Sequence, residues 1–288
     1  MNSKLLSSHI YRACMLEVQA PKAGNVYPSA DFHDMGVMDF ERSAQAIATE
    51  FESIESKTLG ELILSSIQAT HKVTDVNTNL GIVLLFAPIA KAWLHFQKTS
   101  TNTSPDDNEW VKSFQDVIDA STPQDAQSIY QAIVTAKPGG LGKVEESDVQ
   151  DSAPSHIALA MQLASDRDHI AAEWTQQFIR TRRISKELAR LRERDFSWEE
   201  AICWCQLQLL ASQGDTLIRR KNGEEIDLKV RMMAQRILAY CTVENVLEHP
   251  LRSAFDHYLR DEAHQRNPGT TADLIAGGIL ICLLRGIQ

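Results

Sequence analysis

The segment that most constrains this fold is Leu274–Leu284, which is apolar around its whole circumference when it is read as a helix. Such a helix has to be buried on every side, so the other segments must pack around it. The preceding turn 267–269, Asn-Pro-Gly, ends one element, and Thr270 or Thr271 could cap the next. Asp273 in the first turn either completes a capping box with Thr270, the commoner pattern, or is a buried carboxylate with a chemical role.

Apolar residues recur with helical spacing along nearly the whole chain, and no stretch alternates with the period of two that marks a strand. We therefore predict an all-α fold, a single compact multi-helix domain over residues 1–288 with buried central helices. The two most apolar runs, 80–90 and 274–284, are about half the ~20 residues needed to cross a bilayer, so we expect core helices. Helices are expected at about 3–20, 39–53, 58–72, 79–97, 109–118, 123–136, 155–164, 166–180, 182–193, 197–213, 214–221, 224–241, 243–262 and 270–286.

Composition limits the classes of partner. The net charge is −9, and no basic arm or basic stripe with interleaved aromatic residues occurs, which argues against a nucleic-acid partner. The five cysteines are odd in number and scattered, as expected of reduced core thiols. The first residues lack the apolar core of a signal peptide. We expect a cytoplasmic protein that binds a small molecule and no membrane, with a homodimer as one option.

The loop of residues 21–38 carries two groups of polar residues that could do chemistry. Lys22 beside Gly24 suits an anion that the backbone approaches closely. Asp31, His33 and Asp34 have the character of metal ligands or acid–base groups. A polar loop with an Asx-turn would explain the same residues.

Two further segments place polar residues next to apolar helices. Asn77, Thr78 and Asn79 open a very apolar helix, where free N–H groups either bind an anion or are capped by these side chains. Arg167 is predicted on the same helical face as Ile170, where an arginine needs an anionic partner, either a structural carboxylate or a substrate phosphate.

Three other features leave alternatives open. Asp215 and Arg219 could pair on a helix, or the basic run 219–221 could bind a polyphosphate. Glu17 returns to the apolar stripe of the first helix, as a rim residue or as a carboxylate aimed into a cavity. The glycine-rich segment 137–142 could admit an anion or be a plain connection. The arginine-rich segment 180–194 is typical of a solvated, salt-bridged face.

Taken together, these segments resemble the triphosphoribosyl-dephospho-CoA synthase family, the CitG- and MdcB-like proteins. Residues 17–24, Glu-Val-Gln-Ala-Pro-Lys-Ala-Gly, are similar to the family's opening motif of Glu-Val followed by Pro-Lys-Pro-Gly. Residues 31–35 resemble its acidic loop, and residues 267–273, Asn-Pro-Gly-Thr-Thr-Ala-Asp, resemble its closing N-P-G-G-x-A-D. Asp215-Thr216 with Arg219 also resembles a family motif. The order of these pieces covers most of the chain.

The departures from the family pattern are specific. The family carries Thr-His-Lys-Gly where residues 78–81 are Thr-Asn-Leu-Gly, so a histidine and a lysine are replaced. Ala23 replaces a proline, Tyr27 an aspartate and Thr270 a glycine. The chain is similar in these segments to a divergent branch found in archaea and in bacteria that use methanopterin-type one-carbon carriers.

The resemblance implies a transferase that moves the triphosphoribosyl group of ATP to a ribose hydroxyl of dephospho-CoA, with Mg²⁺ and release of adenine. The alternatives are a binding protein of a one-carbon cofactor pathway that has lost catalysis, and another transferase or ligase in pterin- or furan-type cofactor assembly. The catalytic candidates are Asp31, His33, Asp34, Asp215 and Asp273, of which Asp34, Asp215 and Asp273 are the metal-ligand candidates. The nucleotide- and phosphate-binding candidates are Lys22, Gly24, Asn25, Asn77, Thr78, Asn79, Arg167, Arg219, Asn267, Gly269 and Thr270.

Overall fold

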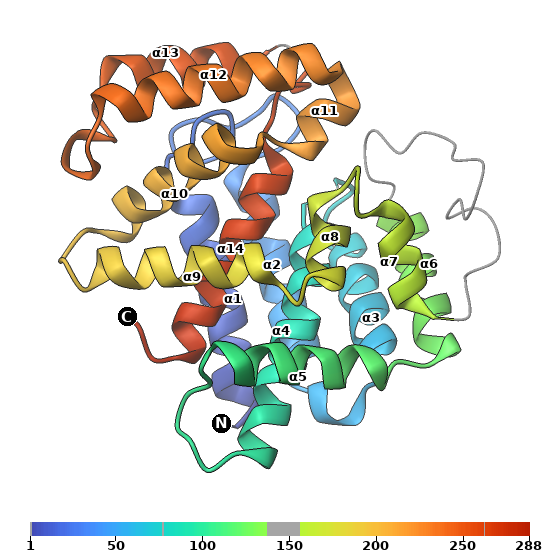
Figure 1. Cartoon of the computed structure of the whole chain (residues 1–288). Helices are drawn as coiled ribbons and strands as arrows, with labels where there is room; N and C mark the ends of the chain where they lie inside the picture. The colour runs from blue at the N-terminus through green and yellow to red at the C-terminus, as the bar shows by residue number, and fades with distance from the viewer. Residues whose placement is uncertain (1, 77, 137–155, 262) are drawn as a thin grey trace.

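The computed structural model describes residues 2–76, 78–136, 156–261 and 263–288. These residues form fourteen α-helices, two short 3₁₀ helices and no strand, so the all-α prediction is confirmed (Figure 1). An isolated bridge pairs Tyr27 with Ala30. The helices are α1 (Ser3–Gln19), α2 (Val37–Phe51), α3 (Leu59–His71), α4 (Leu80–Thr99), α5 (Asp107–Asp119), α6 (Pro123–Ala136), α7 (Ile157–Ala164), α8 (His169–Thr175), α9 (Ile179–Arg192), α10 (Trp198–Gln213), α11 (Thr216–Asn222), α12 (Glu224–Tyr240), α13 (Pro250–Leu259) and α14 (Gly269–Leu284).

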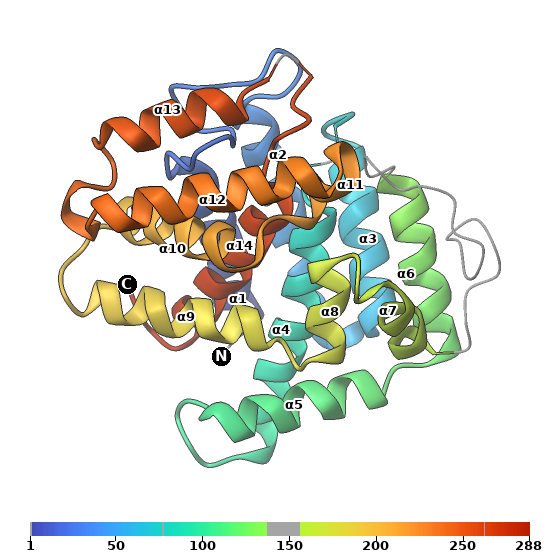
Figure 2. The same ribbon diagram turned by 45° about the horizontal axis from the view of Figure 1, so that its top comes forward.

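Helix α14 runs through the middle of the molecule and is enclosed by α1, α4, α9 and α10 (Figures 1 and 2). Fourteen of its sixteen residues are buried, as predicted for a helix that is apolar on all sides. The capping-box interpretation of its start is wrong. The helix begins at Gly269 after Pro268 without a side-chain cap, so Thr270 and Asp273 both lie inside the helix.

Two consecutive glycines allow α9 to pack closely on α14. A β-carbon added at Gly277 would lie 2.7 Å from Cγ2 of Thr181, and one added at Gly278 would lie 3.0 Å from Cβ of Ile184. Both distances are shorter than an ordinary contact between carbon atoms. The pair therefore fixes how near the two helices can approach.

Helices α10 to α13 enclose a second, smaller hydrophobic cluster beside the main core. In both ribbon views α12 and α13 lie side by side above α10. Helix α10 also packs against α9 and α14, so it connects the two clusters. All five cysteines are free and buried, which confirms their prediction as core thiols.

Helix α4 extends well beyond the apolar run 80–90 and matches the predicted helix 79–97 closely. It is long and apolar enough to cross a membrane, but most of its residues are buried inside the protein. We therefore describe α4 as a core helix. Pro88 lies within it.

Two predicted helices are wrong in their bounds, because each is interrupted in the structure. The expected helix 166–180 ends at Thr175, and Gln177 and Phe178 adopt left-handed backbone angles before α9 begins. Buried Glu173 accepts the backbone N–H groups of Arg180 and Thr181, which satisfies the free end of α9 from the preceding helix. The expected helix 243–262 is likewise a 3₁₀ helix, Val243–Asn245, followed by α13.

Candidate functional site

A cavity of about 460 Å³ lies where the loop after α1 meets the first turns of α4, α8 and α14. Its apolar part is lined by residues of α2, α4, α6, α7 and α8, among them Phe40, Leu84, Ile133, Met161 and Ile170. Its polar part is lined by Glu17, Asn25, Thr78, Asn79, Arg167, Asp168, Arg220, Lys221, Asn267, Gly269, Thr270 and Asp273. This is the size and composition of a site for a small molecule with both a charged and an apolar portion.

Asp273 is the carboxylate that the structure leaves without a partner in this cavity. No described residue donates a hydrogen bond to it. Burial, and next the neighbouring carboxylate of Glu17, raise the pKa of Asp273 well above its ordinary value; Asp215 and Asp168 act in the same direction, and Arg220 opposes them. A carboxyl in this environment holds a proton or attracts a cation.

The start of α4 faces Asp273. A β-carbon added at Gly81 would lie 2.6 Å from Cγ of Asp273, so the carboxylate occupies space that only a glycine leaves free. Asn79 precedes the helix without a side-chain capping bond, and its buried Nδ2 has no hydrogen-bond partner among the described residues. An unpaired buried amide at the start of a helix is a ready donor for an oxygen-rich ligand.

Three cationic side chains border the cavity, those of Arg167, Arg220 and Lys221. Arg220 pairs with Asp168, whose other carboxylate oxygen caps α8 through the N–H groups of Ile170 and Ala171. Arg167 is exposed and forms no ion pair among the described residues. It precedes α8, so the prediction that it lies on a helical face with Ile170 is wrong, although both residues line the cavity. The unpaired guanidinium of Arg167 is available to a phosphate.

The loop 20–26 is held in place by hydrogen bonds to α10 and α13. Lys22 is fully buried, and its ammonium pairs with Glu17 at 2.9 Å and donates to backbone carbonyls, so it does not line the cavity. Gly24 has φ +75° and donates its N–H to Asp256. Asn25 lines the cavity and is held between Gln206 and Asn267.

Asp215 and Arg219 lie beside the cavity and have protein partners. One oxygen of Asp215 caps α11 and the other accepts the N–H of Thr271, which joins α11 to the start of α14. Burial raises the pKa of Asp215, and these hydrogen bonds oppose the shift. Arg219 pairs with Asp227 at 2.8 Å and not with Asp215, so the predicted i,i+4 pair is wrong.

The remaining candidates are outside the cavity lining or outside the described residues. Asp31 is exposed and accepts the N–H of Val37 near the start of α2. His33 and Asp34 form an exposed cluster with His264. Asn77 and the glycine-rich segment 137–142 lie outside the described residues.

The comparison with protein-family models identifies the family of this chain. The sequence model of CitG, described as ATP:dephospho-CoA triphosphoribosyl transferase, matches residues 3–288. The chain belongs to the CitG family. A solved structure described as a "putative triphosphoribosyl-dephospho-coA synthase from Archaeoglobus fulgidus" has a TM-score of 0.64 with 22% identity, covers 85% of this chain and 99% of its own, and supports the fold. A search of curated proteins gave no significant match.

This CitG-family protein is therefore a transferase of the triphosphoribosyl-dephospho-CoA synthase type. Its cavity is also lined by residues that were not among the catalytic and binding candidates. Arg220 and Lys221 face the cavity although Arg219 does not, because consecutive helix residues point about 100° apart. Asp168 lines it as the cap of α8, and Glu17 occupies its wall, which answers the question left open for that glutamate.

Proposed function

We propose that the cavity binds ATP with its triphosphate at the start of α4 and among Arg167, Arg220 and Lys221. The acceptor hydroxyl attacks C1′ of the ribose, a C1′–O bond forms, and the C1′–N9 bond to adenine breaks. The hydroxyl proton passes to a carboxylate, and the departing adenine takes up a proton. The observation that carries this proposal is the unpartnered Asp273 within the cavity.

Asp273 is proposed as the group that protonates adenine. A carboxyl whose pKa is raised keeps its proton nearer to neutral pH and can deliver it to a leaving group. Glu17 lines the same cavity, so its carboxylate faces the positive charge that develops on the ribose in an oxocarbenium-like transition state. Lys22, which does not line the cavity, forms an ion pair with Glu17 and holds its carboxylate in place.

A magnesium ion that accompanies the triphosphate would be held at the polar end of the cavity. Glu17 and Asp168 supply carboxylate oxygens, and Asn79 has an amide oxygen, which are the donors that Mg²⁺ prefers alongside phosphates. Of the three aspartates predicted as ligands, Asp273 lines the cavity, whereas Asp34 and Asp215 do not. When bound, Mg²⁺ would neutralise charge on the triphosphate.

The test is adenine release from ATP and Mg²⁺ with dephospho-CoA as acceptor, followed by chromatography. Replacing Asp273 with asparagine keeps the shape and removes the acid, so kcat should fall by about 10² to 10⁴-fold. The matched control is Asp119→Asn, an exposed aspartate near the end of α5, which should keep wild-type kcat. Wild-type activity in Asp273→Asn would refute the assignment.

A second candidate has its own observation in favour. The family pattern has a lysine where Leu80 lines the cavity, so this chain lacks one cation beside the triphosphate. An enzyme with a pocket altered in this way could use a different acceptor, such as a precursor in one-carbon cofactor synthesis. Alternatively, the protein could bind its ligand without catalysing a reaction. Calorimetric binding of ATP without adenine release in the presence of dephospho-CoA would favour this candidate.

A further inference from the structure

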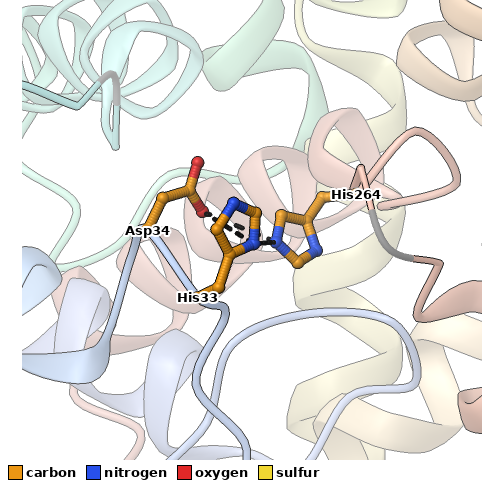
Figure 3. A group of neighbouring side chains, drawn as sticks. All are labelled: His33, Asp34 and His264. Carbon is orange, nitrogen blue, oxygen red and sulfur yellow. Dashed lines mark hydrogen bonds and ion pairs between the residues drawn. The ribbon is translucent and has the colours of Figure 1, made fainter.

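A cluster of three metal-binding side chains lies outside the cavity lining (Figure 3). His33 Nδ1 is 2.7 Å from His264 Nε2, and Asp34 Oδ1 is 3.5 Å from His264 Nε2 and 3.9 Å from His33 Nδ1. Two of the residues come from the loop before α2 and one from the segment before α14. No other group of three His, Cys, Asp or Glu ligand atoms lies so close together in the described part of the chain.

The histidine from the far segment is fixed in place. The ring of His264 stacks on Phe32 with centroids 3.8 Å apart and an angle of 14°. Its backbone N–H donates to Asp261, and its carbonyl accepts from Lys221. His264 also has φ +51°, in the left-handed region that asparagine, aspartate and histidine enter more often than other non-glycine residues.

The separations fit a tetrahedral ion. Zinc binds imidazole nitrogen and carboxylate oxygen at about 2.0–2.2 Å, so two ligand atoms in a tetrahedral site lie about 3.4 Å apart. The carboxylate-to-imidazole distances of 3.5 and 3.9 Å are near this value. The two imidazole nitrogens are now at hydrogen-bond distance, so the distance between them would have to increase by somewhat under 1 Å. The exposed His33 side chain is free to make this movement.

We propose that His33, Asp34 and His264 form a site for a divalent transition-metal ion of the zinc type, with water in the fourth position. Imidazole nitrogen favours such ions over Mg²⁺, which prefers oxygen donors. The site is thus separate from any magnesium that accompanies ATP. It is next to the cavity, because Phe32 and Lys221 contact His264 and also line the cavity.

The experiment is calorimetric titration of tag-free, chelator-treated full-length protein with Zn²⁺, repeated with excess Mg²⁺. The wild type should bind one Zn²⁺ ion, and Mg²⁺ should not displace it. His33→Ala and His264→Asn should each weaken binding at least tenfold, since even residues that only support metal ligands contribute 10–100-fold. Asparagine is chosen at position 264 because it tolerates the left-handed backbone.

The control is His257→Ala, an exposed histidine of α13 that should keep wild-type affinity. Thermal melts of each metal-free variant check that it folds. A Co²⁺-loaded sample provides a second readout, because intense visible absorption marks a tetrahedral site and should vanish in His33→Ala. Equal Zn²⁺ affinity in the wild type and His33→Ala, or displacement by Mg²⁺, would overturn the proposal. None of these readouts requires substrate, so they are independent of the transferase assignment.

Discussion

The contact between Gly81 and Asp273 gives the sharpest prediction. In Gly81→Ala, the new β-carbon would be 2.6 Å from Cγ and 3.2 Å from Cβ of Asp273. Ordinary contacts between carbon atoms are about 3.5–4.0 Å. The Asp273 carboxyl group must therefore move by about 1 Å. Because the obstacle is the end of a side chain, the carboxyl can rotate away and the fold should survive.

The expected result is a loss of activity without a loss of folding. A displacement of about 1 Å in a catalytic group can reduce the rate by about 10²-fold. Alanine is also a better helix former than glycine by up to about 1 kcal/mol, which offsets part of the strain. Adenine release should therefore fall by about two orders of magnitude, while the melting temperature changes by only a few degrees.

A double-mutant cycle tests whether the effect passes through Asp273. Contacting residues are not additive, so Gly81→Ala should have little further effect on kcat in an Asp273→Gly background, where the obstructing side chain is gone. If Gly81→Ala keeps wild-type kcat, or if its effect is undiminished in the Asp273→Gly background, the reasoning from this contact fails.

Two further predictions follow from the charges around the cavity. Arg167→Ala should raise the KM for ATP by about 10- to 100-fold with little change in kcat, since a charge-assisted hydrogen bond contributes about 1.5–3 kcal/mol. The exposed control Arg183→Ala should leave KM unchanged. The raised pKa of Asp273 predicts that the folded state binds more protons at this group than the unfolded state, so stability falls as pH rises from the ordinary aspartate pKa towards the raised one. In metal-free urea unfolding, Asp273→Asn should remove this dependence, whose slope for one proton is at most about 1.4 kcal/mol per pH unit. Parallel curves for the two proteins between pH 5 and pH 8 would contradict the shift.

The fold could be predicted largely because periodicity is a local signal. The all-round apolarity of 274–284 predicted the central position of α14, and the expected helix 197–213 matches α10 closely. The break between α8 and α9 could not be predicted in the same way. No glycine or proline marks it, and the cap comes from Glu173 through contacts that exist only after the chain has turned.

The candidate site could be predicted in its segments but not in every side chain. The start of α4 and the start of α14 do meet at one cavity, through Asn79, Thr270 and Asp273. Which polar residue of each segment faces the cavity depends on packing. Arg167 is available to a ligand because α8 begins two residues after it.

Lys22 and Asp215 explain why a short motif can be recognised without revealing which atoms meet the ligand. Each is completely buried, and each is satisfied by protein partners. Lys22 holds the carboxylate of Glu17 at the cavity wall, and Asp215 ties the start of α14 to α11, which positions Asp273 two residues after its Thr271 contact. Removing a buried partner of this kind leaves an unsatisfied charge. Lys22 and Asp215 therefore help to shape the cavity without lining it. They position Glu17 and Asp273, which are the groups that a ligand would meet.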